Sequence, residues 1–132
     1  MRRRELEIKT RKRSELVEIS EQVREAVREE GFREGLVHLY VPHTTAALTV
    51  SEHIDPRVGA DLLSHLDRLV PWSGAWSHQG NAAAHVKASL VGHSLVLAVE
   101  DGAPAVGSWQ GIFFCEFDGP RKRKVWLSFT GA

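Results

Sequence analysis

The strongest constraint on the fold is a series of strand-length apolar runs in the last third of the chain. Residues 95–99 and 112–117 are largely apolar, and at 125, 127 and 129 apolar residues alternate with mostly polar ones. Turn residues separate these runs, at 101–102 and 118–120. Apolar segments bounded in this way predict β-strands.

The first fifty residues add further strands. Residues 6–19 alternate in polarity around a basic turn, which predicts a hairpin. Residues 36–41 are apolar on both sides, which predicts a central strand covered on both faces, and residues 46–50 follow as a short strand. The basic runs 11–13 and 121–124 predict solvated hairpin tips rather than nucleic-acid contacts.

Three segments have helical spacing. Ser20 is the predicted N-cap of the first helix, which Gly31 ends. Asp55 and Pro56 open the second, and the third spans residues 81–91. The apolar stripe of the second helix consists of Val58, Leu62, Leu66 and Leu69. We therefore predict an α+β fold, with about three helices and seven or eight mostly antiparallel strands in two packed, sandwich-like sheets.

Length and composition indicate a single domain over residues 1–132. Seventeen basic and seventeen acidic residues give a formal net charge of zero, so no overall field attracts nucleic acid or anionic lipid. Cys115 is the only cysteine, which excludes an internal disulfide and suits a reducing compartment. No segment has the pattern of a signal peptide or a membrane span. We expect a cytoplasmic protein without nucleic-acid or membrane partners.

Three short polar segments stand next to the predicted core. They are His43-Thr44-Thr45, residues 78–89 and Gly107-Ser108-Trp109-Gln110-Gly111. If they meet in the folded chain, imidazole, amide, hydroxyl and ammonium groups line one pocket. Such a mixture suits a phosphorylated ligand, a divalent cation, or both.

Three histidines of these segments are candidate metal ligands. His43, His78 and His85 are nitrogen donors on three different elements, and three such donors with an open position suit zinc or a similar ion. Their spacing is not diagnostic, because a hydrogen-bonded structural histidine is more common than a ligand. Both interpretations stay open at this point.

Other polar residues extend the candidate site. Glu52 and Asp61 are candidates for a base, a metal ligand or a group that orients an imidazole, and the alternative is helix-end electrostatics. Trp109 and Gln110 lie between two glycines, which permit close approach of a ligand or of a neighbouring subunit. Phosphate-binding or hydrogen-bonding candidates on the third helix are Asn81, Lys87 and Ser89.

The ordered motifs resemble those of a known family. They are His43 to Val50, Glu52, Asp55-Pro56, Asp61, His78, Asn81, Ala84 to Gly92 and Gly107-Ser108-Trp109-Gln110-Gly111. Across nearly the whole chain they are similar to the YjbQ family, the uncharacterised protein family UPF0047 of bacteria and archaea. The sequence departs from the family pattern at Ser51 and His53, where asparagines usually flank the glutamate.

The resemblance implies a β-sandwich-like α+β protomer that assembles as a homotrimer. It also implies a secondary thiamine-phosphate synthase activity, which joins a pyrimidine diphosphate to a thiazole phosphate and releases pyrophosphate. In that interpretation a divalent metal, zinc or magnesium, is held by His43, His78 and His85. Catalytic roles fall to Glu52, Asp61 and His85, and substrate binding to Asn81, Lys87, Ser89, Trp109 and Gln110. The alternative is a trimeric module that binds a metal or a phosphorylated metabolite without turnover.

Overall fold

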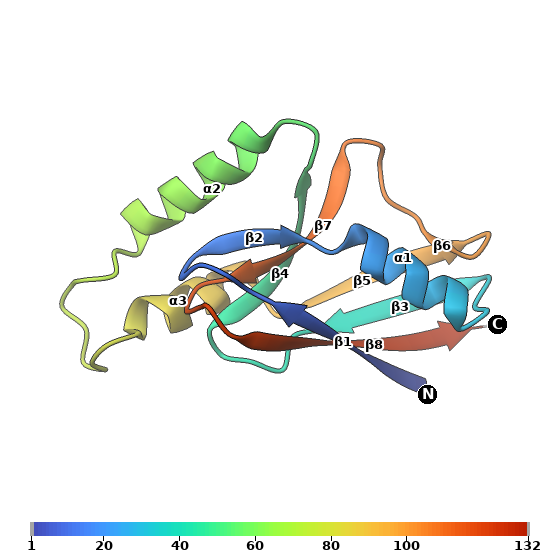
Figure 1. Cartoon of the computed structure of the whole chain (residues 1–132), viewed down its shortest axis with the longest axis horizontal. Coiled ribbons are helices and arrows are strands. Elements are labelled where there is room, and N and C mark those ends of the chain that lie inside the picture. The colour runs from blue at the N-terminus through green and yellow to red at the C-terminus, as the bar shows by residue number, and fades with distance from the viewer. Residues whose placement is uncertain (1, 132) are drawn as a thin grey trace.

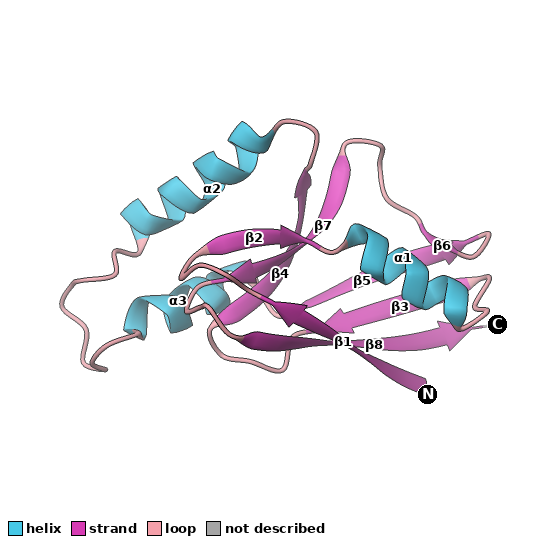
Figure 2. Cartoon of the chain, in the orientation of Figure 1, coloured by secondary structure: helices cyan, strands magenta, loops and turns pink. Residues whose placement is uncertain are grey.

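β-Strands provide most of the fold, as the apolar runs predict. The computed structural model describes residues 2–131, and within them the chain forms eight strands and three helices (Figures 1 and 2). In chain order these are β1 (Arg2–Lys9), β2 (Glu15–Glu18), α1 (Ser20–Glu29), β3 (Gly35–Tyr40), β4 (Ala46–Glu52), α2 (Pro56–Leu69), α3 (Ala82–Val91), β5 (Ser94–Glu100), β6 (Ala103–Pro104), β7 (Gln110–Glu116) and β8 (Lys122–Gly131). None of the described helices is both long enough and apolar enough to cross a membrane.

The strands form two sheets. The larger has the order β1-β8-β3-β5-β6 and the smaller β2-β7-β4, and all neighbouring strands are antiparallel. The predicted α+β class with two packed antiparallel sheets is confirmed.

The main core fills the space between the two sheets. Alternate residues of the larger sheet, such as Val37 and Leu127, face Leu48 and Phe114 of the smaller sheet. Helix α1 closes one end of this layer with its apolar stripe, which includes Val23 (Figure 1). Each such side chain contributes roughly 1.5–3 kcal/mol when it is fully buried.

A second core lies on the other face of the smaller sheet. There Ala47 and Cys115 contact Ala84 and Ala88 of α3, and Phe117 completes the buried cluster. Alanines on both sides allow α3 to approach the sheet closely. Helix α2 covers the same side more loosely, through the partly buried side chains of its Leu63 and Leu66. Leu16 of β2 and Trp72 of the loop after α2 are also partly buried against this cluster. Helices α2 and α3 and the loop between them therefore lie together at one end of the molecule (Figure 2).

The predicted hairpin over residues 6–19 is wrong. β1 pairs with β8, where Leu6 lies opposite Val125, whereas β2 pairs with β7, where Leu16 lies opposite Cys115. The chain thus passes from one sheet to the other through its basic turn. Alternating polarity predicts which face of a strand is buried, but it does not select the partner strand.

Within the described chain, residues 36–41 are covered on one face only, and not on both as predicted. Val37 and Leu39 are buried, but on the opposite face Leu36 is 46% exposed and Tyr40 is 41% exposed. On the neighbouring strand Val96 is 60% exposed. The outer face of the larger sheet is therefore open and partly apolar. A strand that is apolar on both faces predicts that other elements cover both faces of the sheet. The described residues supply no element over the outer face of the larger sheet.

Two helix details differ from prediction. The N-cap of α1 is Ile19, and the Ser20 hydroxyl instead donates to Glu18 Oε2 and accepts the N–H of Ile112. In α2 the packed residues are Leu63 and Leu66, so the predicted stripe is rotated. Val58 and Leu69 of that stripe are exposed, because α2 contacts the sheet along one narrow line.

Candidate functional site

The clearest polar arrangement lies where the 70–80 loop meets the start of α3. The rings of His78 and His85 are perpendicular, with centroids 5.4 Å apart. His78 Nε2 lies 2.9 Å from Asn81 Oδ1, and Asn81 Nδ2 donates to Asp118 Oδ2 at 2.8 Å. Because a carboxylate can only accept, Asn81 turns its NH₂ to Asp118 and its oxygen to His78. His78 therefore carries its proton on Nε2, which leaves Nδ1 available.

A hollow adjoins this pair. It has a volume of about 350 Å³ and is lined by Trp76, Ser77, His78, Ala82, His85 and Val86. Asn81 stands at the N-cap position of α3, but its side chain makes no capping bond. Its bonds to His78 and Asp118 instead fix the loop against the start of the helix.

The histidine pair fits part of a metal site. Two imidazoles that share a tetrahedral zinc ion, with Zn–N bonds of about 2.0 Å, have ring centres roughly 5 Å apart. The observed separation of 5.4 Å matches that distance, and it also lies within the ordinary range of an edge-to-face contact between two rings. Among residues 2–131, however, no three His, Cys, Asp or Glu side chains are grouped so that they hold a metal by themselves. The remaining ligands of such an ion have to come from water, substrate or another chain.

His43 lines a different hollow. This second hollow has a volume of about 470 Å³ and is lined by Tyr40, Pro42, His43, Thr44, His93 and Trp126. His43 Nε2 accepts the backbone N–H of Lys124 at 2.9 Å. Burial first, and then the positive charge of Arg123, lower the pKa of His43. The structure thus brings His78 and His85 together and lines a separate hollow with His43.

A buried ion pair supports the His43 segment. Arg123 and Glu116 are 2% and 0% exposed, and Arg123 Nε donates to Glu116 Oε1 at 2.8 Å. Arg123 also donates to the hydroxyl of Thr45 at 2.8 Å. The prediction that residues 121–124 form a solvated tip is therefore wrong for Arg123, because alternation along β8 directs this side chain inward. Glu116 receives further bonds from the Thr10 hydroxyl and the Asp118 N–H.

Glu52 and Gln110 are engaged in local structure. Glu52 Oε2 accepts the N–H groups of Ile54 and Asp55, both at 2.8 Å, and so fixes the turn before α2. Gln110 Oε1 accepts the Gly107 N–H at 2.8 Å. Trp109 is 63% exposed and is presented at the surface by this loop.

The side chain of His53 approaches Gly111 closely. A Cβ at Gly111 would lie 2.6 Å from Glu18 Oε2 and 2.8 Å from His53 Cβ, so only glycine fits there. His53 Nδ1 lies 2.7 Å from Glu18 Oε2, and its Nε2 lies 3.3 Å from the Ser108 carbonyl. Sequence reasoning left open what the glycine admits, a ligand or another subunit. In the described chain, Gly111 admits this contact between Glu18 and His53.

The remaining candidates lie apart from the histidine pair's hollow. Lys87 is buried, forms an ion pair with Asp67 of α2 and lies 5.8 Å from the centre of the Phe117 ring. Ser89 is on the exposed face of α3, and Asp61 is on that of α2. Lys87 therefore connects the two helices.

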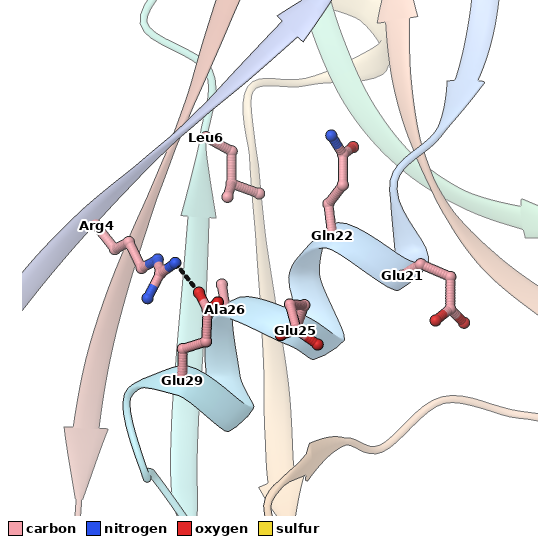
Figure 3. A pocket seen from close by; sticks show the side chains of 7 residues that line it. All are labelled: Arg4, Leu6, Glu21, Gln22, Glu25, Ala26 and Glu29. Atoms are coloured by element: carbon pink, nitrogen blue, oxygen red, sulfur yellow. Dashed lines mark hydrogen bonds and ion pairs between the residues drawn. The ribbon is translucent and has the colours of Figure 1, made fainter.

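One further hollow contains none of the predicted site residues. It lies between β1 and α1, has a volume of about 420 Å³ and is crossed by the ion pair of Arg4 with Glu29 (Figure 3). Its lining is completed by Leu6, Glu21, Gln22, Glu25 and Ala26. Glu21 and Glu25 are paired with arginines of their own helix. We assign this surface no role.

The chain has close relatives of known sequence and structure. A family model described as UPF0047 protein YjbQ-like matches residues 4–132. A UPF0047 protein of Methanocaldococcus jannaschii is 45% identical over 95% of this chain and 91% of its own length. The UPF0047 protein YugU of Bacillus subtilis is 44% identical over 96% of this chain and 97% of its own.

Solved structures agree with the fold. A YjbQ/UPF0047 family protein from Clostridium acetobutylicum, described as an uncharacterized conserved protein, superposes with a TM-score of 0.92 at 42% identity, covering 96% of this chain and 98% of its own. A hypothetical protein from Aeropyrum pernix superposes with a TM-score of 0.94 at 36% identity, and each chain is covered completely, at 100%. The match therefore extends over the histidine pair, the second hollow and the Trp109 loop.

Proposed function

The chain belongs to the YjbQ-like UPF0047 family, and from that premise we propose that it is an enzyme acting on phosphorylated small molecules with a divalent metal ion. The specific form of the proposal is a secondary thiamine-phosphate synthase. Such an enzyme joins a pyrimidine diphosphate to a thiazole phosphate and releases pyrophosphate.

The pairing of His78 with His85 beside the first hollow is the observation that carries the proposal. We assign the ion to these two imidazoles. A pair of nitrogen donors favours zinc over magnesium, which prefers oxygen ligands. When bound, the ion would supply positive charge that stabilises a departing diphosphate.

The chain's own residues have definite tasks in this scheme. Asp118 orients Asn81, and Asn81 holds His78 in the tautomer whose Nδ1 is free. Trp76 forms a wall of the hollow. Lys87 is already neutralised by Asp67, so we assign it to helix packing rather than to phosphate.

We further propose that three copies assemble and that the site is completed between subunits. This proposal accounts for the positions of Glu52, Asp61, Ser89, Trp109 and Gln110, which no described contact joins to the histidine pair. The open sheet face with Leu36 and Val96 provides apolar area for such a contact. Size-exclusion chromatography with light scattering measures the molar mass of the protein in solution. A monomer at all concentrations would contradict the proposed trimer.

The alternative function is binding without turnover. It is favoured because residues 2–131 of a single chain place no carboxylate in the lining of the first hollow. A metal-binding or phosphometabolite-binding trimeric module needs only the hollow, whereas the enzyme also needs a base or a nucleophilic substrate brought to it.

The test is purified protein that has been stripped of metal, reloaded with zinc or magnesium and supplied with both thiamine precursors. We expect pyrophosphate release in the wild type and its loss in His78→Ala and His85→Ala. The matched control is His65→Ala, because His65 is exposed on α2. No turnover with either metal, or turnover unchanged in His85→Ala, would remove the enzyme proposal. Saturable binding without product would support the module instead.

A further inference from the structure

The two basic runs of the sequence meet in the folded chain. One lies in the turn between β1 and β2, and the other follows the turn between β7 and β8. The two turns lie side by side, although they are far apart in the sequence (Figure 1). Taken separately, each run predicts a solvated tip, whereas together they form one surface. We call this surface the basic patch, and its members are Lys9, Arg11, Lys12, Arg13, Arg121 and Lys122.

Hydrogen bonds hold the two turns together. The backbone N–H of Thr10 donates to the Arg121 carbonyl at 3.0 Å, and the Thr10 hydroxyl accepts the Arg121 N–H at 3.0 Å. The N–H of Gly119 donates to the Arg13 carbonyl at 3.1 Å. A Cβ at Gly119 would lie 2.4 Å from the Lys12 carbonyl oxygen, so only glycine permits this approach. The basic patch is therefore preformed and not the chance meeting of two loose loops.

Most of the positive charge of the basic patch is uncompensated. The two turns contain only two carboxylates, Glu15 and Asp118. Asp118 pairs with Arg121, and Glu15 accepts two backbone N–H groups of its own turn, at 2.7 and 3.1 Å. The other five basic side chains of the patch are exposed, and none of them forms an ion pair within residues 2–131. In a chain of zero net charge, this is a local concentration of positive charge.

Two lysines of the basic patch lie directly opposite each other. Lys9 is in register with Lys122 across the antiparallel strands β1 and β8, and both side chains are exposed. Residues in this position have Cβ atoms about 4.5–5.5 Å apart, and like charges there destabilise the sheet. Two residues further along the same face, Glu7 lies opposite Lys124, so the repulsion is confined to the patch. An anion between the two ammonium groups would relieve it.

The composition of the two turns favours nucleic acid over a lipid surface. Residues 9–15 and 118–122 contain no aromatic or branched apolar side chain that could insert into a bilayer. The guanidinium carbon of Arg13 lies 4.2 Å from the centroid of the Trp72 ring, which holds a planar cation at the edge of the basic patch. Unstacked bases of single strands stack on such guanidinium planes, whereas the bases of a duplex are already stacked.

We propose that the basic patch binds single-stranded nucleic acid, with phosphates held by the cations of both turns and a base stacked on Arg13. None of its residues lines the hollow beside His78 and His85. The proposal goes beyond the proposed enzyme function and depends neither on turnover nor on a metal. It also replaces the expectation, drawn from each basic run alone, that the chain has no nucleic-acid partner.

The probe is a fluorescein-labelled oligouridylate of about twelve nucleotides, with binding measured by fluorescence anisotropy over a series of salt concentrations. Five phosphate contacts predict a slope of about −3.5 for the logarithm of the association constant against that of the salt concentration. Lys9→Gln combined with Lys122→Gln should make this slope shallower by about 1.4 and weaken binding about tenfold to a hundredfold near 50 mM salt. Both lysines are exposed, so the double variant is expected to fold.

The matched control is Arg24→Gln combined with Arg33→Gln. It removes the same charge from exposed ion pairs outside the basic patch, with Glu21 and Asp101, and should bind as the wild type does. No binding by the wild type near 50 mM salt, or an equal loss in the two double variants, would overturn the proposal.

Arg13→Lys tests the stacked base, because it keeps the charge and removes the guanidinium plane. We expect weaker binding of the oligouridylate and unchanged binding of a duplex of the same length. Tighter binding of the duplex than of the single strand by the wild type would overturn the proposal, since charge alone would then explain the affinity. Binding to phosphatidylserine vesicles without binding to the oligouridylate would overturn it in favour of a membrane.

His85→Ala separates this inference from the proposed function. The variant is expected to bind the oligouridylate as the wild type does. Loss of that binding would place the nucleic acid at the proposed metal site and overturn the inference. Absence of zinc binding in the wild type would remove the metal proposal and leave the oligouridylate result unaffected.

Discussion

Replacing Arg123 with methionine tests the buried network below the His43 segment. The change removes the two bonds to the Glu116 carboxylate and the bond to the Thr45 hydroxyl. Glu116 is 0% exposed and retains only the Thr10 hydroxyl and the Asp118 N–H as donors. Breaking a buried pair by removing one partner typically costs roughly 3–5 kcal/mol. We expect a loss of that size in the free energy of unfolding, measured by urea denaturation near pH 7.

The loss of unfolding free energy in Arg123→Met depends on pH, and the pKa of Glu116 sets the direction. Burial alone would raise the pKa of Glu116, but the bonds from Arg123, Asp118 and Thr10 hold it below its usual value of 4.5. In the wild type this contribution is present above pH 4.5 and is lost as the pH falls through the lower folded value. Without Arg123, burial raises the pKa, so the carboxyl becomes neutral more easily. The difference between variant and wild type should therefore be largest near neutral pH and smallest in acid.

Two further variants make the reasoning refutable. Glu116→Gln removes the charge but keeps an acceptor oxygen, so the double variant with Arg123→Met should recover much of the loss. The control is Arg24→Met, since Arg24 is paired with Glu21 on the exposed face of α1. Exposed pairs contribute about 0–1 kcal/mol. The argument fails if Arg123→Met costs no more than Arg24→Met, or if the double variant is as unstable as the single variant.

Three other predictions follow from the same structure. The pKa of His53 is raised, chiefly by its bond to Glu18. Burial alone would raise the pKa of Glu18, but the bonds from His53 and Ser20 and the positive charges of His53 and Arg24 together lower it. The stabilisation from this pair should be greatest between about pH 4.5 and 6.5 and fall on either side. Urea denaturation over a series of pH values should show this maximum in the free energy of unfolding of the wild type but not of His53→Asn. Gly111→Ala should lower stability by about 1–3 kcal/mol in thermal unfolding, because its Cβ meets His53 Cβ at 2.8 Å. Burial raises the pKa of Cys115 to about 12, so thiol reagents should label it only as fast as the chain unfolds, and rapid native labelling would contradict this.

Local sequence signals predicted the parts of the fold that depend on neighbouring residues. Asp55 accepts the Arg57 N–H at 3.0 Å and Pro56 is the first residue of α2, as their order in the sequence indicates. Gly31 follows α1 with a φ of +67°, a conformation that glycine adopts without strain. Caps and stops need only a few consecutive residues, so the sequence specifies them directly.

Strand partners depend on the whole chain and were less predictable. β1 finds its partner more than a hundred residues away, at Val125 opposite Leu6. The polarity of either strand is equally compatible with a local hairpin. The side chain of Arg123 points inward only because of the register of β8 in the sheet. The sequence alone does not give that register, so the basic run 121–124 suggested a solvated turn.

The candidate site likewise has one part that depends on neighbouring residues and another that depends on long-range pairing. His78, Asn81 and His85 lie within eight residues, so one helix start brings them together. The pairing of His43 with the backbone of Lys124 spans 81 residues and required the order β8-β3 in the larger sheet. The resemblance to the family made His43 a candidate site residue, but which of its two ring nitrogens is already hydrogen-bonded depends on this long-range contact.

Consecutive residues of β8 fix both ends of the His43 segment. Arg123 reaches inward to the Thr45 hydroxyl, and the next backbone N–H, that of Lys124, reaches His43. The buried ion pair therefore supports the segment, in addition to any contribution to stability. A segment held from both ends loses little conformational entropy on binding a ligand, which favours a preformed hollow over one that closes on its guest. Weakening the network should thus loosen the His43 segment even where the protein remains folded, and faster hydrogen exchange of the Lys124 amide would show it.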